Sequence, residues 1–237
     1  MYVEITARLT NWDQYREGTH KSVQVRFPTS REEMQKALKD IGVDGIRYRQ
    51  VILTEFDSNL SGFCHCLTRY DSVDEVNYLA RLLSELSDSE LKTFLSVLEY
   101  GEHSLGAVDM IDLALNLDHY ELHPGVGTDE ELGRIYVDDL EMLDVPENVL
   151  PYFDYEAYGR DVRLNENGCF VKGGYLTRNP STLVERCGGP EDIPPEHRVF
   201  SYPKLTIREK LAAYKEVTGR AAPDSTRPAP EQGHDDR

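Results

Sequence analysis

The acidic residues of this chain are concentrated in one continuous stretch. Between Asp71 and Asp161 the sequence holds 23 aspartates and glutamates against four arginines and lysines. The segments on either side are almost neutral, while the whole chain has a net charge of −17. Such a concentration of like charge repels nucleic acid and attracts proteins that bind nucleic acid. We therefore expect a fold that keeps most of these carboxylates on the surface.

Charge alone leaves three explanations of the acidic stretch open. General adaptation to salt or solubility would spread acid over the whole chain, and the neutral flanks argue against it. Cation binding is the second explanation. The third is imitation of DNA, which presents one negative charge per about 1.7 Å of its axis. An ordinary solvated helix face would alternate glutamate with lysine, because each i,i+4 pair gains about 0.2–0.5 kcal/mol.

The composition favours several small modules over one deep core. Hydrophobic residues make up 39% of the chain, below the usual range of about 45–50%. No stretch approaches the ~18 apolar residues of a membrane span, and the N-terminus has no signal-peptide pattern. Four cysteines are too few for a disulfide framework, so reduced thiols and a cytoplasmic location are expected.

The apolar pattern predicts an α+β protein of small units that follow one another along the chain, with an extension after them. Residues 1–66 form a small α+β module, with strands over 2–7, 23–27 and 47–56 and a helix over 30–41. Residues 67–118 form a short helical bundle. Asp71 or Ser72 caps its first helix, Ser87 and Glu90 form a capping box for the second, and a third covers 105–117.

Residues 119–178 are predicted to be a second α+β module. Its expected elements are a short helix or turn over 129–137 leading into a strand, a short helix over 146–150, and strands around 162–164 and 169–171 joined by a hairpin turn at 165–168. Residues 179–237 form the extension, with a solitary helix over 207–217 and a disordered tail over 221–237. Several carboxylates lie opposite the apolar stripes of the helical module and should point outward: Asp74, Glu75, Glu85, Asp88, Glu90, Asp109 and Asp112.

A pair of histidines suggests a metal site only weakly. His119 and His123 are four residues apart, a spacing that shares a metal on a helix. However, Tyr120 stands where a zinc protease has its glutamate, and Pro124 ends any helix directly afterwards. A structural histidine pair is therefore favoured, and no cofactor, metal or catalytic residue is expected.

The segment from Leu143 to Asp161 interleaves aromatic and acidic residues. It reads LDVPENVLPYFDYEAYGRD, and aromatic rings next to acids are suited to protein interfaces. The alternative to an interface is a packed strand in which the acidic residues form the outer edge. The run VPENVLPYFDYEAYGRD resembles the antirestriction motif of the ArdA family of DNA-mimic proteins. The resemblance continues in IGVDGIRY at 41–48, YDSVDEVNYLARLL at 70–83, NLDHYELHP at 116–124 and GGY at 173–175.

The resemblance implies an elongated α+β protein of three modules that dimerises. It also implies a non-enzymatic inhibitor whose surface acids imitate bent DNA in the groove of type I restriction–modification enzymes. It implies module boundaries near 66, 118 and 178, and acids of the second and third modules in the place of phosphates. These would be Asp74, Glu75, Glu85, Asp88, Glu90, Asp109, Asp112, Asp118, Glu121, Asp129, Glu130, Glu131, Asp138, Asp139 and Glu141. The dimer contact would involve Asp144, Val145, Pro146, Tyr152, Phe153, Asp154, Tyr155, Glu156, Tyr158, Gly159, Arg160 and Asp161.

The chain departs from the resemblance at its C-terminal end, because residues 179–237 continue beyond the GGY region. The segment 204–215 weakly resembles helices appended to proteins of conjugative elements. Alternative functions are inhibition of another DNA-binding defence complex, a metal-dependent enzyme using His119 and His123, and an acidic assembly protein of a mobile element.

Overall fold

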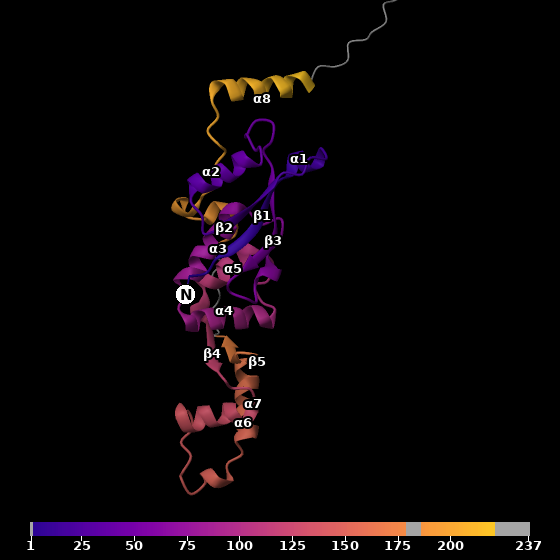
Figure 1. The fold of residues 1–237 in the computed structure, drawn as a ribbon. Coiled ribbons are helices and arrows are strands. Elements are labelled where there is room, and N and C mark those ends of the chain that lie inside the picture. Colours follow the sequence, from indigo (N-terminus) through magenta and orange to yellow (C-terminus); the bar gives the residue numbers. More distant parts are fainter. Residues whose placement is uncertain (1, 179–185, 221–237) are drawn as a thin grey trace, which may run out of the picture.

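The computed structural model describes residues 2–178 and 186–220 and shows an elongated α+β protein (Figure 1). Helix α8 (Ile207–Arg220) lies at one end of the molecule, and α6 (Asp129–Arg134) and α7 (Tyr155–Glu166) lie towards the opposite end. The predicted α+β class is confirmed. The tail predicted to be disordered, residues 221–237, lies outside the described residues.

The N-terminal sheet contains three antiparallel strands in the order β2–β1–β3. They are β1 (Ile5–Asn11), β2 (Ser22–Phe27) and β3 (Val51–Ser58), which confirms the three predicted strands with shifted bounds. Helix α2 (Arg31–Asp40) buries Met34 and Leu38, and the Ser30–Glu33 capping box fixes its start. The burial of alternate β1 residues places one face of the sheet in the core.

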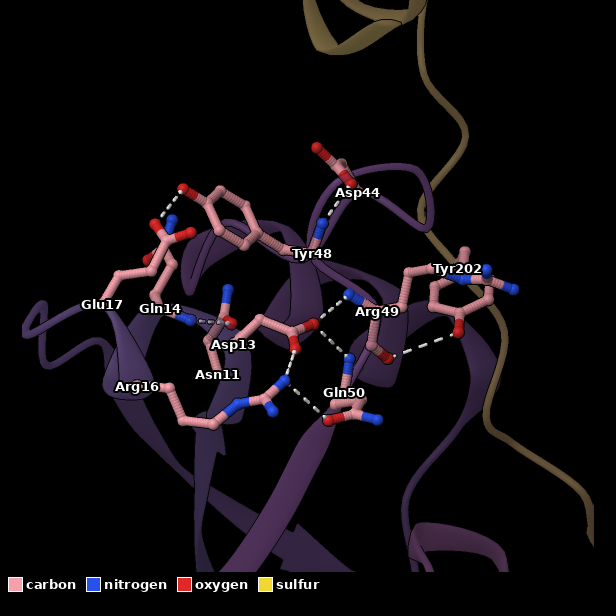
Figure 2. A network of polar contacts seen from close by, with 10 residues as sticks. All are labelled: Asn11, Asp13, Gln14, Arg16, Glu17, Asp44, Tyr48, Arg49, Gln50 and Tyr202. Carbon is pink, nitrogen blue, oxygen red and sulfur yellow. Dashed lines mark hydrogen bonds and ion pairs between the residues drawn. The ribbon is translucent and has the colours of Figure 1, made fainter. Parts of the chain in front are cut away.

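A polar network fastens the turn before β3 to the short helix α1 (Trp12–Arg16) (Figure 2). The Asp13 carboxylate accepts hydrogen bonds from the backbone N–H groups of Arg49 (2.7 Å) and Gln50 (2.8 Å), and from the Arg16 guanidinium (2.7 Å). Asn11 caps α1 by accepting a hydrogen bond from the backbone N–H of Gln14. This turn therefore has a fixed position relative to the sheet.

The helical part contains α3 (Val73–Glu85), α4 (Asp88–Tyr100) and α5 (Ala107–Leu115), which confirms the three predicted helices. Capping boxes begin both α3 and α4, and Gly101 ends α4 in the left-handed region. One continuous apolar core extends through the N-terminal sheet, these helices and residues as distant as Val199. The proposed module boundaries at 66 and 118 stay a prediction.

The second sheet is antiparallel, with the order β4–β6–β5. Its strands are β4 (Tyr120–Pro124), β5 (Cys169–Val171) and β6 (Gly174–Arg178). α6 and α7 pack against each other next to this sheet. A smaller second core lies there, formed by Val126, Leu132, Tyr136, Val162 and Tyr175.

Three predictions for this region differ from the structure. The stretch predicted as a strand around 162–164 and a hairpin turn at 165–168 belongs mainly to α7, which continues to Glu166 and ends at Asn167 in the left-handed region. The turn between β5 and β6 lies instead at residues 172–173. The strand expected after 129–137 is also wrong, because α6 continues into a π-helical turn, Ile135–Asp139. The short helix expected over 146–150 is a 3-10 turn, Leu150–Tyr152.

The described residues beyond β6 pack back onto the N-terminal part. We call residues 186–203 the C-terminal segment. The Asp74 carboxylate accepts hydrogen bonds from the backbone N–H groups of Val199 (2.6 Å) and Phe200 (2.7 Å), and Asn77 donates to the carbonyl of His197. α8 follows, as predicted. Ion pairs join its Glu209 and Glu216 to Lys39 and Arg47.

Candidate acidic interaction surface

The carboxylates of the acidic stretch fall into two groups that the sequence does not distinguish. Ten of them are exposed and have no hydrogen bond or ion pair within the described part of the chain. We call these ten the free carboxylates. They are Glu85, Asp88, Glu99, Asp118, Asp139, Glu141, Asp144, Glu147, Glu156 and Asp161.

The first free carboxylates lie on α3, α4 and the turn before β4. Glu85 is at the end of α3, and Asp88 and Glu99 are on α4, in the middle of the molecule (Figure 1). Asp118 follows α5 in a 3-10 turn. The capping boxes and apolar faces that fix α3 and α4 therefore also fix where these charges stand.

The other free carboxylates lie at the end of the molecule that carries α6 and α7. Asp139, Glu141, Asp144 and Glu147 come from the connection between these helices, and Glu156 and Asp161 from α7 itself. The part of this connection that covers residues 138–152 is called the tip. The tip also exposes large apolar side chains: Leu140, Met142, Leu143, Val149 and Tyr152. It therefore combines dense negative charge with an unburied apolar surface.

The remaining carboxylates of the stretch contact the protein itself. Glu75 was expected to point outward, and this expectation was wrong: it is 5% exposed, and its carboxylate closes the α3 capping box by accepting the Ser72 N–H. Burial raises the pKa of Glu75, and the hydrogen bonds from Ser72 oppose that rise. Asp112 accepts the N–H of Arg186 at 2.6 Å. Asp109 contacts the His103 ring and the Leu105 N–H.

Near the tip, several acids hold α6 and α7 in place. Asp129 accepts two hydrogen bonds from the Arg163 guanidinium, at 2.7 and 3.1 Å, which lowers the pKa of Asp129. Glu130 pairs with Arg134 one turn later in α6. Asp138 accepts a hydrogen bond from the Tyr155 hydroxyl at 2.9 Å.

We call the carboxylates that bond to the protein itself tied. The other tied members of the predicted surface accept hydrogen bonds from backbone N–H groups or contact a nearby histidine. Glu131 accepts the Gly127 N–H, Glu90 accepts the Ser87 N–H, and Glu121 pairs with His123. Of the fifteen acids predicted for the surface, the structure therefore leaves five without a described partner: Glu85, Asp88, Asp118, Asp139 and Glu141.

The residues of the predicted dimer contact occupy two kinds of position. Tyr152 is 88% exposed, and Asp144, Pro146, Glu156, Arg160 and Asp161 are also on the surface. Phe153 packs edge-on against Tyr155 and Tyr158, Asp154 caps α7 through the Ala157 N–H, and Val145 is partly buried.

Gly159 differs from both groups, because it lies within the α6–α7 contact. A Cβ added there would collide with the backbone carbonyl of Asp129, and one added at Gly133 with that of Tyr155. Two glycines thus let the helices approach backbone to backbone. This role is internal to the monomer, and the spacing of Gly159 with Tyr155 and Val162 on one helix face was the sequence signal for it.

The two histidines do not lie on a helix together. His119 ends a 3-10 turn and His123 lies in β4, where it stacks on Tyr175. No group of three metal-binding side chains occurs within residues 2–178 and 186–220. Within the same ranges, no helix has the length and apolar character needed to cross a membrane.

Five free carboxylates were not predicted for the acidic surface: Asp144, Glu156 and Asp161 were assigned to the dimer contact, and Glu99 and Glu147 were not singled out at all. Glu99 lies on the polar side of α4, the pattern that identified the other surface acids of that helix. Glu147 lies inside the aromatic and acidic run, the pattern that identified Asp144 and Glu156.

The family model described as "Antirestriction protein (ArdA)" matches residues 8–177. A search of the curated proteins found no match. The matched residues include every free carboxylate and the tip, and they end before the C-terminal segment.

Proposed function

The chain belongs to the ArdA family of antirestriction proteins, and on this premise we propose that it inhibits type I restriction–modification enzymes by occupying their DNA-binding channel. The observation that carries the proposal is the series of free carboxylates on α3, α4, the turn before β4, the tip and α7. These elements extend from the middle of the elongated molecule to one of its ends (Figure 1). The protein acts without catalysis and protects incoming DNA by binding where DNA would bind.

The mechanism is electrostatic substitution. The free carboxylates take the place of duplex phosphates and pair with lysine and arginine side chains that line the channel. Association is accelerated by the long-range attraction between opposite charges, and both rate and affinity fall as salt rises. Phosphate contacts carry no sequence information, so the inhibitor recognises a class of DNA channels rather than one recognition sequence.

Free and tied carboxylates have different roles in this proposal. The free carboxylates that the dimer contact leaves exposed pair with the enzyme, while acids that bond to the protein itself, such as Glu75 and Asp129, hold helices in position. Because an exposed ion pair contributes about 0.2–1 kcal/mol, changing one free carboxylate to alanine should weaken binding only slightly. Reversing several together should abolish it. One free acid whose loss removed all inhibition would contradict a distributed surface.

We propose that two copies associate through the exposed part of the segment 144–161. Tyr152, the apolar side chains of the tip and Pro146 supply exposed area for such a contact. Gly159 and Tyr155, by contrast, serve packing inside one monomer. A dimer would double the length of the acidic surface offered to one channel.

The function is tested by titrating the purified protein into a type I restriction–modification enzyme bound to labelled DNA, at low and at moderate salt. Displacement of DNA at low salt, weaker at moderate salt, supports the proposal. Failure to displace DNA at low salt overturns it for that enzyme. The matched variant replaces Asp139, Glu141 and Asp144 with lysine and should lose displacement while keeping the thermal stability of the parent protein.

A further inference from the structure

A groove of about 640 Å³ lies where the C-terminal segment meets the N-terminal part of the molecule. Three regions line it: residues 49–53 around the start of β3, residues 69–74 around the start of α3, and Pro190, Phe200 and Tyr202 of the C-terminal segment. Trp12, the first residue of α1, completes the lining. The volume is within the range of small-molecule sites in proteins, about 300–1,000 Å³.

Aromatic side chains form much of the wall. Tyr70 is 81% exposed, and Phe200 and Tyr202 pack edge to face with their ring centroids 5.4 Å apart. Trp12 is held by stacking on Tyr15 at 5.2 Å. Aromatic walls of this kind favour flat rings, because offset and edge-on ring pairs add attraction beyond the buried area.

The charges of the groove select the sign of a ligand. Both carboxylates of the groove already accept hydrogen bonds from backbone N–H groups. Asp71 accepts those of Thr68 and Ala107. Asp74 accepts those of Val199 and Phe200. The Arg49 guanidinium has no hydrogen bond or ion pair among the described residues. Arg69 lies over the ring of Tyr70. Guanidinium groups are therefore what the groove can offer to a ligand, and they suit an anion.

The groove depends on the C-terminal segment, which lies outside the family match. Tyr202 sits directly over Gly45, where an added Cβ would be 2.6 Å from the ring and where φ is +73°. The Tyr202 hydroxyl donates to the carbonyl of Arg49, as Figure 2 shows. The turn that carries Arg49 is in turn fixed by Asp13. The site is thus assembled from fixed parts rather than from a loose surface.

From this geometry we propose that the groove binds a small ligand in which a planar aromatic ring is joined to an anionic group, a carboxylate or a phosphate. The ring stacks against Tyr70, Phe200 and Tyr202, and the anion pairs with Arg49. This site is separate from the free carboxylates and does not depend on the DNA-mimic proposal.

The chain provides its own reporter, because Trp12 is its one tryptophan and lines the groove. Adenosine 5′-monophosphate and phenylacetate serve as probes of the class, one with a phosphate and one with a carboxylate. Adenosine and inorganic phosphate, which carry only the ring or only the anion, serve as controls. We expect at least one probe to change the fluorescence emission of Trp12 saturably. That probe should bind about tenfold more tightly than either control, because one ion pair or one stacked ring can supply a difference in affinity of this size.

Two variants test the contacts. Arg49→Glu should weaken probe binding at least about tenfold, while the matched Arg26→Glu, on an exposed β2 residue outside the groove, should leave it unchanged. Tyr202→Ala should weaken ring binding, with thermal unfolding used to check that the variant is folded. The proposal is overturned if neither probe gives a saturable change at millimolar concentration, or if Arg49→Glu binds as the parent does. Displacement of DNA from a restriction enzyme should be the same for parent and Arg49→Glu, so the two proposals fail independently.

Discussion

Asp13 illustrates how a single residue fixes a distant turn in this protein. Burial alone would raise the pKa of its carboxyl group, but the N–H groups of Gln50 and Arg49 and the Arg16 guanidinium outweigh burial and lower it. A carboxyl whose pKa is lowered by folding stabilises the folded state above its unfolded pKa, and that stabilisation is lost as the pH falls through the folded pKa.

Replacing Asp13 with asparagine should lower the free energy of unfolding at neutral pH by about 1–3 kcal/mol, because two backbone N–H groups lose a charged acceptor. The variant should also lose less stability than the parent between neutral pH and about pH 3. Denaturant unfolding at both pH values measures this. Parallel pH dependence in parent and variant would contradict the role given to the carboxylate.

Residue by residue, the sequence was a good guide to caps and a poor guide to which acids stay free. Ser87 and Glu90 form their predicted capping box because both partners are three residues apart. By contrast, the Asp74 carboxylate accepts hydrogen bonds from the N–H groups of Val199 and Phe200, which lie more than a hundred residues later in the chain. No local pattern predicts a partner at that separation.

Asp74→Ala should therefore destabilise the protein by about 1–3 kcal/mol, since it leaves two partly buried N–H groups without an acceptor. Glu99→Ala is the control: its carboxylate is free and lies in the last turn of α4, away from the helix N-terminus, so its loss should change stability by no more than about 0.5 kcal/mol. Thermal unfolding compares the two. Equal stability of both variants would remove the distinction between tied and free acids.

Among the elements, α6 and α7 show where sequence patterns were misleading. Asn165-Glu-Asn-Gly168 has the composition of a hairpin turn, yet Asn167 uses its tolerance of the left-handed region to end a helix. The helical alternative was visible in the spacing of Tyr155, Tyr158, Gly159 and Val162. Packing against α6, through Gly133 and Gly159, decides between the two.

Gly159→Ala should destabilise the end of the molecule that carries the tip by about 1–3 kcal/mol or more, because the added methyl group overlaps the Asp129 carbonyl and forces the helices apart. Gly219→Ala in α8 is the control, since nothing lies within 4 Å of an added Cβ there. Alanine favours helix over glycine by about 0.5–1 kcal/mol, so the control should be neutral or stabilising. Circular dichroism during heating distinguishes them, and a Gly159→Ala protein that melts with the parent would contradict the close contact.

At the scale of the whole molecule, the sequence predicted the α+β class, the elongated shape and the segregation of charge. It did not predict that the C-terminal segment shares a core with the N-terminal sheet, because the contacts of Ile193 and Val199 are long-range. The acidic stretch also proved to be mixed in purpose. Some of its carboxylates hold helices and turns in place, and the free carboxylates extend from the end of α3 to the tip and α7.

The central claim is that the free carboxylates bind the enzyme as phosphates do, and it is tested by the salt dependence of affinity. The measurement is the dissociation constant for a DNA-free type I restriction–modification enzyme over a series of salt concentrations. It is made for the parent, for a tip variant (Asp139→Asn, Glu141→Gln, Asp144→Asn), and for an equally neutralised control on the N-terminal part (Glu32→Gln, Asp40→Asn, Asp57→Asn). Affinity should fall steeply with salt for the parent and the control, and less steeply for the tip variant. Equal slopes for the tip variant and the control would contradict the claim.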